Sequence, residues 1–411
     1  MPFDRLSSLQ FVLAARNLVR HRTRTLISLS AIAFGVAALL IAGGFVEWIF
    51  WAMRHSTINA GLGHIHITRP GFIQDGSARP HQFLMAPDAA TVSAVRKLPG
   101  VTAVDQRLNV SGLASHGNVT VGFTGEAVDP EPYRATSSDL SVAGENLDAA
   151  RPSDVLLGRG LAQTLKVRRG DMVTLLVSLP RGGINAVEAR VGGTFATAVR
   201  AFDDSAVRMP LELGRQLLRV DGAHRLVVKL KETEATDGAL AALKAVLPSE
   251  RFALTSWLEQ SDFYRKAVVL LSRQIEVMAI VIGAIIVLGI TNTLTMNVLE
   301  RTGEIGTMMA MGTSRSRVLQ LFLAEGALLG VTGASVGLVI ASLLAQALSY
   351  FGIPMPPPPG RDTGYSAEIL LTPKLAAWGA ATAFLSTVIA SLYPAWRASR
   401  LTIVDALRHN R

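Results

Sequence analysis

The chain has 411 residues, of which 49% are hydrophobic and 17% are charged, whereas soluble globular domains carry about 25% charged residues. This deficit and the mean hydropathy of +0.35 indicate a membrane protein. The sequence contains no cysteine, which excludes disulfides and thiolate metal sites. The net charge of +9 does not indicate a nucleic-acid partner, because the arginines gather next to apolar segments.

Residues 1–24 predict a cytoplasmic amphipathic helix, here called the elbow helix. The stretch "LSSLQFVLAARNLVRHRTRT" has an apolar side and a basic side, and such helices lie in the membrane interface. The alternative is a basic anchor that only sets the orientation of the chain. The residues assigned to the interface are Arg16, Asn17, Arg20, Arg22 and Arg24.

Four apolar blocks are long enough to cross a bilayer, which needs about 20 mostly apolar residues. The blocks begin at Thr25, Val277, Gly326 and Leu375, and they contain no Asp, Glu, Lys or Arg. We predict transmembrane helices over residues 25–53 (with the start of a stalk), 268–299, 317–350 and 374–397. An ion pathway normally shows ionisable side chains inside the spans, so ion-coupled transport is disfavoured. Small and hydroxyl residues in the second and third blocks favour close helix packing.

The arginines set the predicted orientation. They cluster before the first span, between the second and third spans, and after the fourth. By the positive-inside rule these three segments, including both termini, are cytoplasmic. Residues 54–267 and the short loop 351–373 are then outside, and residues 398–411 form a cytoplasmic tail. Four consecutive prolines in the loop favour a stiff polyproline II connector, with a recognition ligand as the alternative.

Residues 54–267 predict a large water-soluble domain of mixed α and β structure. Alternating apolar residues predict strands at "GHIHITR", "GNVTVGFTGEAV", "DMVTLLVSL" and "HRLVVKLK". Helices are predicted at "PDAATVSAVRKL", "RGLAQTL", "PLELGRQLL" and "ATDGALAALKAVL". The first and last of these helices each end at a proline and run into a β-rich stretch, which suggests two similar helix-to-strand units. The fold class is therefore a membrane α+β protein with four transmembrane helices and a large mixed α/β extracytoplasmic domain between helices 1 and 2.

Residues 300–316 separate two of the most apolar blocks, yet they carry more pattern than a plain connection needs. The stretch "ERTGEIGTMMAMGTSRSRV" has Glu300 and Glu304 at its start, where carboxylates suit the positive end of a helix. Methionines follow, and they form adaptable apolar surfaces. We interpret the segment as a short cytoplasmic helix with an exposed apolar face that docks into a groove of another protein. A helical hairpin packed only on its own bundle is the alternative.

The motifs of common enzymes are missing from the sequence. It has no G-x-x-x-x-G-K-[ST] phosphate loop. Its G-x-S-x-G match, "GASVG" from Gly333, lies inside the third apolar block and not at a strand-to-helix elbow. The two histidines of "GHIHI" lie at i and i+2, as a metal pair could require, but no third ligand has a suitable spacing. The paired carboxylates of "FDDSAV" are typical of a turn in which Asp bonds its own backbone. We therefore predict no catalytic, metal or cofactor site on this chain.

Three membrane-side stretches resemble the signature of the MacB/FtsX-type ABC transporter permeases. They are "LAARNLVRHRTRTLISLSAIAFGVA", "ERTGEIGTMMAMGTSRSRVLQLFLAEGALLG" and "YPAWRASRLTIVDALR". The outer stretches "DVLLGRGLAQTLKVRRGDMVTLL" and "FDDSAVRMPLELGRQLL" look most like the LolC/LolE lipoprotein-releasing branch. One departure is the short "SLPRGGINAVEAR", at the position where LolC-type subunits carry a long hook that recruits a periplasmic carrier.

The resemblance implies a permease half in the bacterial inner membrane that pairs with a second copy or a paralogue. Two copies of a separate cytoplasmic ATPase would bind ATP and Mg²⁺ and drive motion of the periplasmic domain, a cycle of mechanotransmission. The segment from Glu300 to Gly312 would be the coupling helix that engages the ATPase. Its assigned residues are Glu300, Arg301, Glu304, Ile305, Gly306, Met308, Met309, Met311 and Gly312.

Three functions are compatible with this resemblance. The first is extraction or export of an amphiphile, such as a lipoprotein or lipid, with a periplasmic carrier or adaptor as a further partner. The second is efflux of a peptide or drug through an adaptor protein. The third is an FtsX-like signalling role in which the ATPase activates a periplasmic hydrolase and nothing is transported.

Overall fold

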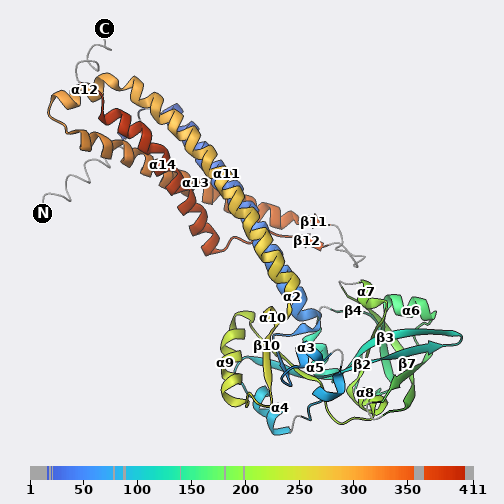
Figure 1. Ribbon diagram of the computed structural model, residues 1–411. Coiled ribbons are helices and arrows are strands. Elements are labelled where there is room, and N and C mark those ends of the chain that lie inside the picture. Colours follow the sequence, from blue (N-terminus) through green and yellow to red (C-terminus); the bar gives the residue numbers. More distant parts are fainter. Residues whose placement is uncertain are drawn as a thin grey trace. The chain divides into compact units, whose positions relative to one another are not determined.

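The computed structural model describes residues 16–17, 20, 22–76, 79–86, 89–138, 140–179, 182–197, 200–355 and 365–402 (Figure 1). The chain divides into two compact units. The helical unit comprises the described residues of Met1–Phe50, Ala267–Pro354 and Ser366–Arg411, and the sheet unit those of Trp51–Lys266 and Met355–Tyr365. The four prolines predicted to stiffen the loop lie outside the described residues, as does most of the C-terminal tail.

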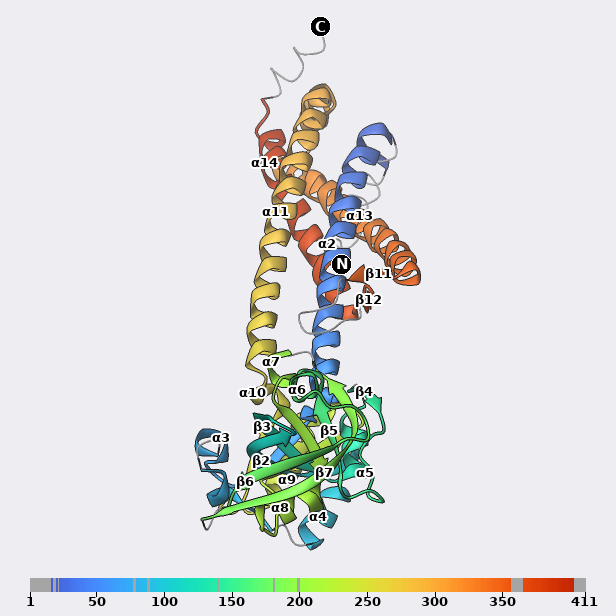
Figure 2. The same ribbon diagram turned by 90° about the vertical axis from the view of Figure 1, so that its right-hand side faces the viewer.

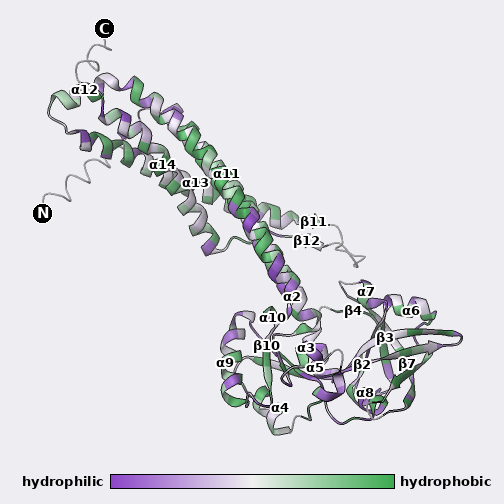
Figure 3. Ribbon diagram, viewed as in Figure 1, coloured by the Kyte–Doolittle hydropathy of each residue, from purple (hydrophilic) through white to green (hydrophobic). Residues whose placement is uncertain are grey.

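Four long helices supply the helical unit, as predicted. They are α2 (Arg22–Thr57), α11 (Asp262–Glu300), α13 (Arg315–Phe351) and α14 (Pro373–Ser399). Each contains a stretch long and apolar enough to cross a membrane, and Figure 3 shows the apolar residues along them. Helix α11 begins at Asp262, inside the range 54–267 assigned to the extracytoplasmic domain, because its polar first turns continue the helix beyond the apolar block. A short pair of strands, β11 (Ile353–Met355) and β12 (Tyr365–Ala367), follows α13.

Glycines let α13 pack closely against two neighbours. A Cβ atom on Gly330 would lie 2.2 Å from Thr387 Oγ1 of α14. A Cβ atom on Gly337 would lie 2.7 Å from the Cβ of Val36 on α2. Small residues are a typical basis of helix association in lipid, where apolar burial does not drive it. The predicted role of small residues in the third span is therefore confirmed at these two contacts.

The sheet unit is built on a ten-stranded sheet in the order β10-β1-β9-β2-β3-β8-β5-β7-β4, with β6 paired to both β2 and β7. Figure 2 labels strands β2 to β7 of this sheet. Its strands are β1 (Ile65–Thr68), β2 (Val101–His116), β3 (Val119–Val128), β4 (Ser141–Gly144), β5 (Asp154–Gly158), β6 (Met172–Ser178), β7 (Ile184–Ala196), β8 (Ala206–Pro210), β9 (Arg225–Leu230) and β10 (Ala253–Ser256). Its α-helices are α3 (Phe72–Asp75), α4 (Ala89–Arg96), α5 (Pro130–Thr136), α6 (Arg159–Leu165), α7 (Arg200–Asp203), α8 (Leu211–Leu218), α9 (Thr236–Val246) and α10 (Trp257–Gln260). A π-helical turn, η1 (Ile58–Leu62), follows α2.

One half of the sheet unit is a split β-α-β arrangement. The chain runs β1-α4-β2 and later β9-α9-β10, and the four strands lie side by side in the order β10-β1-β9-β2. Both helices contribute to one hydrophobic core, with Val95 of α4 and Leu243 of α9 packed in the same cluster as Ile65. The two helix-to-strand units suggested by the sequence therefore share one sheet and one hydrophobic core.

The other half closes on itself. Strands β2, β3, β8, β5, β7 and β6 are each paired with the next, and β6 pairs back to β2 at Leu113–Ser115. A core cluster draws buried side chains from all six strands and from α6 and α8. The closure leaves β2 in both halves: its first residues pair with β9 and its last with β3.

Candidate functional site

The predicted coupling segment forms a short helix, α12 (Thr302–Ala310), between α11 and α13. Gly312, with a φ of 94°, ends it, because this left-handed backbone conformation is open to glycine and strained for most residues. Ser314 takes the N-cap position of α13. The polar start, the glycine break and the basic following helix thus match the sequence pattern.

The apolar side of α12 faces its own bundle, which corrects the expectation of an exposed apolar face. Ile305 is fully buried and Gly306 is buried. Met308 and Met309 pack against a cluster that includes Phe322 of α13. An amphipathic helix must cover its apolar side. Among the described residues, the surface that covers this side of α12 belongs to the helices of its own bundle.

The residues that remain exposed on α12 lie on one face. Glu304, Thr307 and Met311 follow the i, i+3, i+7 spacing of a helix stripe, and Ala310 and Gly312 lie beside them. Met311 is 76% exposed. We call Glu304, Thr307, Ala310 and Met311 the outer face of α12. Of the predicted apolar residues, Met311 is the one whose side chain is exposed.

The elbow residues contact the coupling segment, a link that the sequence did not reveal. Arg20, which is helical, donates to Glu304 Oε1 at 3.2 Å. Arg24, in the first turn of α2, forms an ion pair with Glu300. The two sets of predicted residues are therefore one cluster at the arginine-rich end of the helical unit.

Asn17 and Arg301 meet at a residue that sequence reasoning missed. The Asn17 amide and the Arg301 guanidinium both donate to Oε1 of Glu325, at 2.8 and 3.1 Å. Arg16 and Arg22 are exposed. Glu325 directly precedes the apolar block that begins at Gly326. An acidic residue at the edge of a membrane span is the sequence feature that could have pointed to it.

His66 of β1 and His64, which directly precedes β1, form hydrogen bonds within the fold. His64 Nδ1 accepts the Leu230 N–H at 3.1 Å, and His66 Nε2 donates to Leu62 O at 2.6 Å. Burial lowers the pKa of His64 to about 4 and that of His66 to about 3. Both rings are thus neutral hydrogen-bonding groups. Among the described residues no group of three or more His, Asp or Glu side chains could hold a metal ion.

The carboxylates of "FDDSAV" also have backbone partners. Asp203 accepts from the Thr197 N–H at 2.9 Å and from its hydroxyl at 2.8 Å. The prediction that an aspartate here bonds the backbone is confirmed for the buried Asp203, but this residue ends α7 and its donors belong to Thr197, directly after β7.

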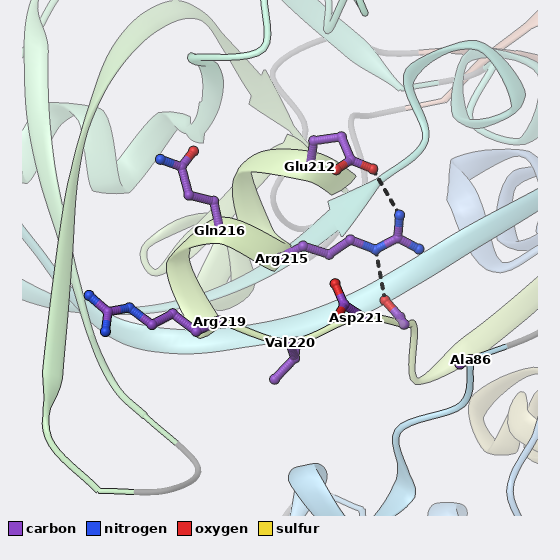
Figure 4. Close-up of a pocket in the computed structure, with 8 residues that line it drawn as sticks. Ala86, Glu212, Arg215, Gln216, Arg219, Val220 and Asp221 are labelled. Atoms are coloured by element: carbon purple, nitrogen blue, oxygen red, sulfur yellow. Dashed lines mark hydrogen bonds and ion pairs between the residues drawn. The ribbon is translucent and has the colours of Figure 1, made fainter.

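A polar hollow of about 570 Å³ lies at the C-terminal end of α8 (Figure 4). Arg215 crosses it and bonds Glu212 at 2.8 Å and Gly222 O at 3.2 Å. Its guanidinium also donates to Gln106 at 3.2 Å. Because Arg215 is held on three sides within the fold, the hollow does not present it as a catalytic group.

The described residues that flank 180–181 pair closely between β6 and β7. Leu179 N–H donates to Gly183 O at 2.9 Å, and Gly182 N–H donates to Leu179 O at 3.0 Å. Both glycines have φ near 90°, which a compact turn requires. The described residues on either side of 180–181 thus leave no room for a long insert, in agreement with the departure seen in the sequence.

Comparison with known proteins identifies the parts of the chain. Residues 25–246, more than half of the chain, match the MacB-like periplasmic core domain, and residues 276–403 match the FtsX-like permease C-terminal domain. The macrolide export ATP-binding/permease protein MacB of Shewanella sp. is 24% identical over 97% of this chain and 60% of its own length. The chain thus spans about three fifths of that relative.

Two further relatives match without that difference in length. An uncharacterized ABC transporter permease of Methanocaldococcus jannaschii is 24% identical over 96% of each chain. The lipoprotein-releasing system transmembrane protein LolC of Xylella fastidiosa is 26% identical over 73% of this chain and 78% of its own. The chain belongs to the MacB/FtsX-type ABC transporter permease superfamily.

Proposed function

We propose that this chain is the permease subunit of an ATP-driven transporter of the bacterial inner membrane, with the sheet unit in the periplasm and both termini in the cytoplasm. The observation that carries the proposal is the arginine-rich end of the helical unit. There α12 presents its outer face, while Arg20 of the elbow binds Glu304 and α13 binds Arg301 through Glu325. A separate ATPase docks on that face, and its ATP-driven closure moves α12.

ATP and Mg²⁺ belong to the partner in this proposal. The sequence has no phosphate loop, and the MacB relatives, whose name includes an ATP-binding part, extend well beyond the length that this chain matches. Two ATPase copies and a second permease, identical or paralogous, complete the transporter. The motion passes along the long helices to the periplasmic domain.

The cargo that fits is an amphiphile such as a lipoprotein or lipid, taken from the outer leaflet of the inner membrane. The resemblance to LolC supports it, while the close pairing of the residues that flank 180–181 argues against recruitment of a carrier through a long hook. The resemblance to MacB favours a second function, efflux of a peptide or drug through an adaptor. An FtsX-like signalling role, in which a periplasmic hydrolase is activated, is the third.

The deciding experiment is affinity purification of the tagged chain from its native membranes, with mass spectrometry of bound proteins and extracted lipids. Recovery of an ABC ATPase together with an acylated molecule supports the amphiphile permease. An ATPase with an adaptor supports efflux, and an ATPase with a hydrolase and no lipid cargo supports signalling. Absence of any ATPase overturns the proposal.

A further inference from the structure

Glu325 is a buried carboxylate within a helix that can cross the membrane. It lies in α13, and only 1% of its surface is exposed. Burying a carboxylate costs much free energy unless charged partners compensate. Neither contact with lipid nor apolar packing explains a glutamate at this position, so the explanation must lie in its polar partners.

Its partners come from two other segments. Oε1 accepts from Asn17 of the elbow helix at 2.8 Å and from Arg301, at the start of α12, at 3.1 Å. The Arg301 side chain is itself 8% exposed. Charge-assisted hydrogen bonds of this kind are stronger than neutral ones, and the low local dielectric strengthens them further. Through Oε1, Glu325 thus connects α13 to both the elbow helix and α12.

Arg301 extends the connection to the outer face of α12. Its Nε donates to Glu304 Oε2 at 3.1 Å, and its guanidinium lies over the Phe322 ring at 5.8 Å. Glu304 in turn accepts from Arg20. A chain of ionic hydrogen bonds therefore runs from the exposed Glu304 through Arg301 to the buried Glu325.

The connection continues into α14. Gly326 follows Glu325, and a Cβ atom there would lie 2.6 Å from the Cβ of Ser391. Two helices that approach this closely cannot slide past each other without a clash. A displacement of α13 at Glu325 is thus passed to α14 one residue further on.

We infer that Glu325 is a positioning residue that locks α12 to α13, so that the push of the ATPase on the outer face moves the helical unit as one body. The inference rests on the proposed function and assigns the internal linkage behind its docking face. An apolar contact alone would hold α12 in place, but it would not fix its register on α13 as a directional ion pair does.

The test is the double variant Arg301→Met with Glu325→Met, prepared as the full chain in nanodiscs with the co-purified ATPase. Replacing a buried ion pair by apolar residues leaves no unpaired charge, so we expect the melting temperature to stay at or above that of the wild type. ATPase binding is retained, because Arg301 is buried and the outer face keeps all four of its residues, with Glu304 still bonded to Arg20. Permease-stimulated ATP hydrolysis falls about tenfold, within the range typical of coupling between sites.

Two further variants separate positioning from stability. Glu325→Gln keeps an oxygen that accepts from Asn17 and Arg301, so it should retain more stimulation than the double variant. The pair Arg54→Met with Glu234→Met removes an Arg–Glu ion pair of 3.1 Å in the sheet unit and should leave stimulation unchanged. Since the chain has no cysteine, spin labels at Thr307→Cys and Ser335→Cys, diluted with unlabelled chain, report the α12–α13 distance directly. That distance distribution is narrow in the wild type and broad in the double variant.

Full stimulation and a narrow distance distribution in the folded double variant overturn the inference. So does a loss of stimulation that follows a loss of ATPase binding in the same proportion, because α12 would then have lost its docking face. Failure of the wild-type chain to bind an ATPase overturns the proposed function instead, and the spin-label distances still test the linkage.

Discussion

Arg107 and Arg225 lie directly opposite one another on the neighbouring strands β2 and β9. Like charges facing each other across a sheet are destabilising, and both residues are largely buried. Two carboxylates resolve the conflict: Asp105 of β2 accepts from Arg107 Nε at 2.7 Å, and Glu126 lies on β3. Its carboxylate forms ion pairs with Arg225 and with Arg208 and lies 3.7 Å from Arg107. One acid thus joins the two halves of the sheet unit where β2 passes from one to the other.

Changing Glu126→Gln should therefore destabilise the sheet unit strongly. It removes the charge that compensates the buried guanidinium groups of Arg208 and Arg225, and breaking a buried ion pair from one side costs about 3–5 kcal/mol. Urea unfolding of the detergent-solubilised chain, in a Trp48, Trp51, Trp378 and Trp396→Phe background that leaves the buried Trp257 as the fluorescent reporter, measures the loss. Glu188→Gln, at an exposed position on β7, is the control and should change the free energy of unfolding by less than about 0.5 kcal/mol. Equal effects of the two changes would refute the compensating role of Glu126.

Acidification should weaken the sheet unit through its buried histidines. Burial lowers the pKa of His64 and His224 to about 4 and that of His66 to about 3, below the ordinary value of about 6.5. The native state therefore binds fewer protons than the unfolded state. The stabilisation is fully present above pH 6.5 and is lost as the pH falls toward 4. For His66 alone, the loss between pH 7 and pH 5 is about 2 kcal/mol.

Unfolding free energies measured from pH 7.5 to pH 5 test this sign. His66→Gln removes the titrating group, and its amide can donate to Leu62 O in place of the ring, so the slope with pH should become shallower. His81→Gln, at an exposed position, is the matched control. A slope that is the same in His66→Gln as in the wild type would show that His66 is not a source of the pH dependence.

Sequence patterns predicted the elements whose periodicity has one simple cause. The four apolar helices follow from bilayer thickness, and β1, β3, β6 and β9 follow from the alternation of apolar and polar residues in their sequences. Strands β5 and β8 were missed because they are buried on both sides and do not alternate. The pairing of β6 with β2, which closes one half of the sheet unit, joins residues far apart in sequence. No local sequence pattern encodes such a pairing.

The candidate site was predicted to a similar extent. The short helix and its capping signals are local, so α12 was found. Which side of α12 faces inward depends on the angle between α11 and α13, so the exposure of Ile305, Met308 and Met309 was predicted wrongly. Glu325 was missed because its partners Asn17 and Arg301 are 308 and 24 residues away in sequence.

Gly337→Ala should loosen the helical unit. The added Cβ would lie 2.7 Å from the Cβ of Val36 and 2.8 Å from the backbone oxygen of Ala33, and overpacking of this kind costs about 1–3 kcal/mol. Gly289→Ala in α11 is the matched control, because a Cβ there has nothing within 4 Å and alanine favours a helix. The melting temperature in detergent should fall for Gly337→Ala and hold or rise for Gly289→Ala. The reverse order would contradict the close packing of α13 on α2.

Two methionines of the coupling segment should respond differently to the same change. Met311 is 76% exposed, so Met311→Asp should leave the melting temperature of the permease unchanged and weaken ATPase binding at least about tenfold, as loss of a central interface anchor does. Met308 packs on the cluster around Phe322, so Met308→Asp buries a charge and should lower the melting temperature of the permease. A loss of ATPase binding by this variant is then explained by the loss of folded permease. Co-purification of the ATPase and thermal unfolding, measured on both variants, separate these outcomes. Val246→Asp, at an exposed apolar position of the sheet unit, controls for the added charge. If Met311→Asp binds the ATPase as the wild type does, the docking contact does not depend on the outer face of α12, because the change adds a charge to its most exposed apolar side chain without disturbing the helix beneath.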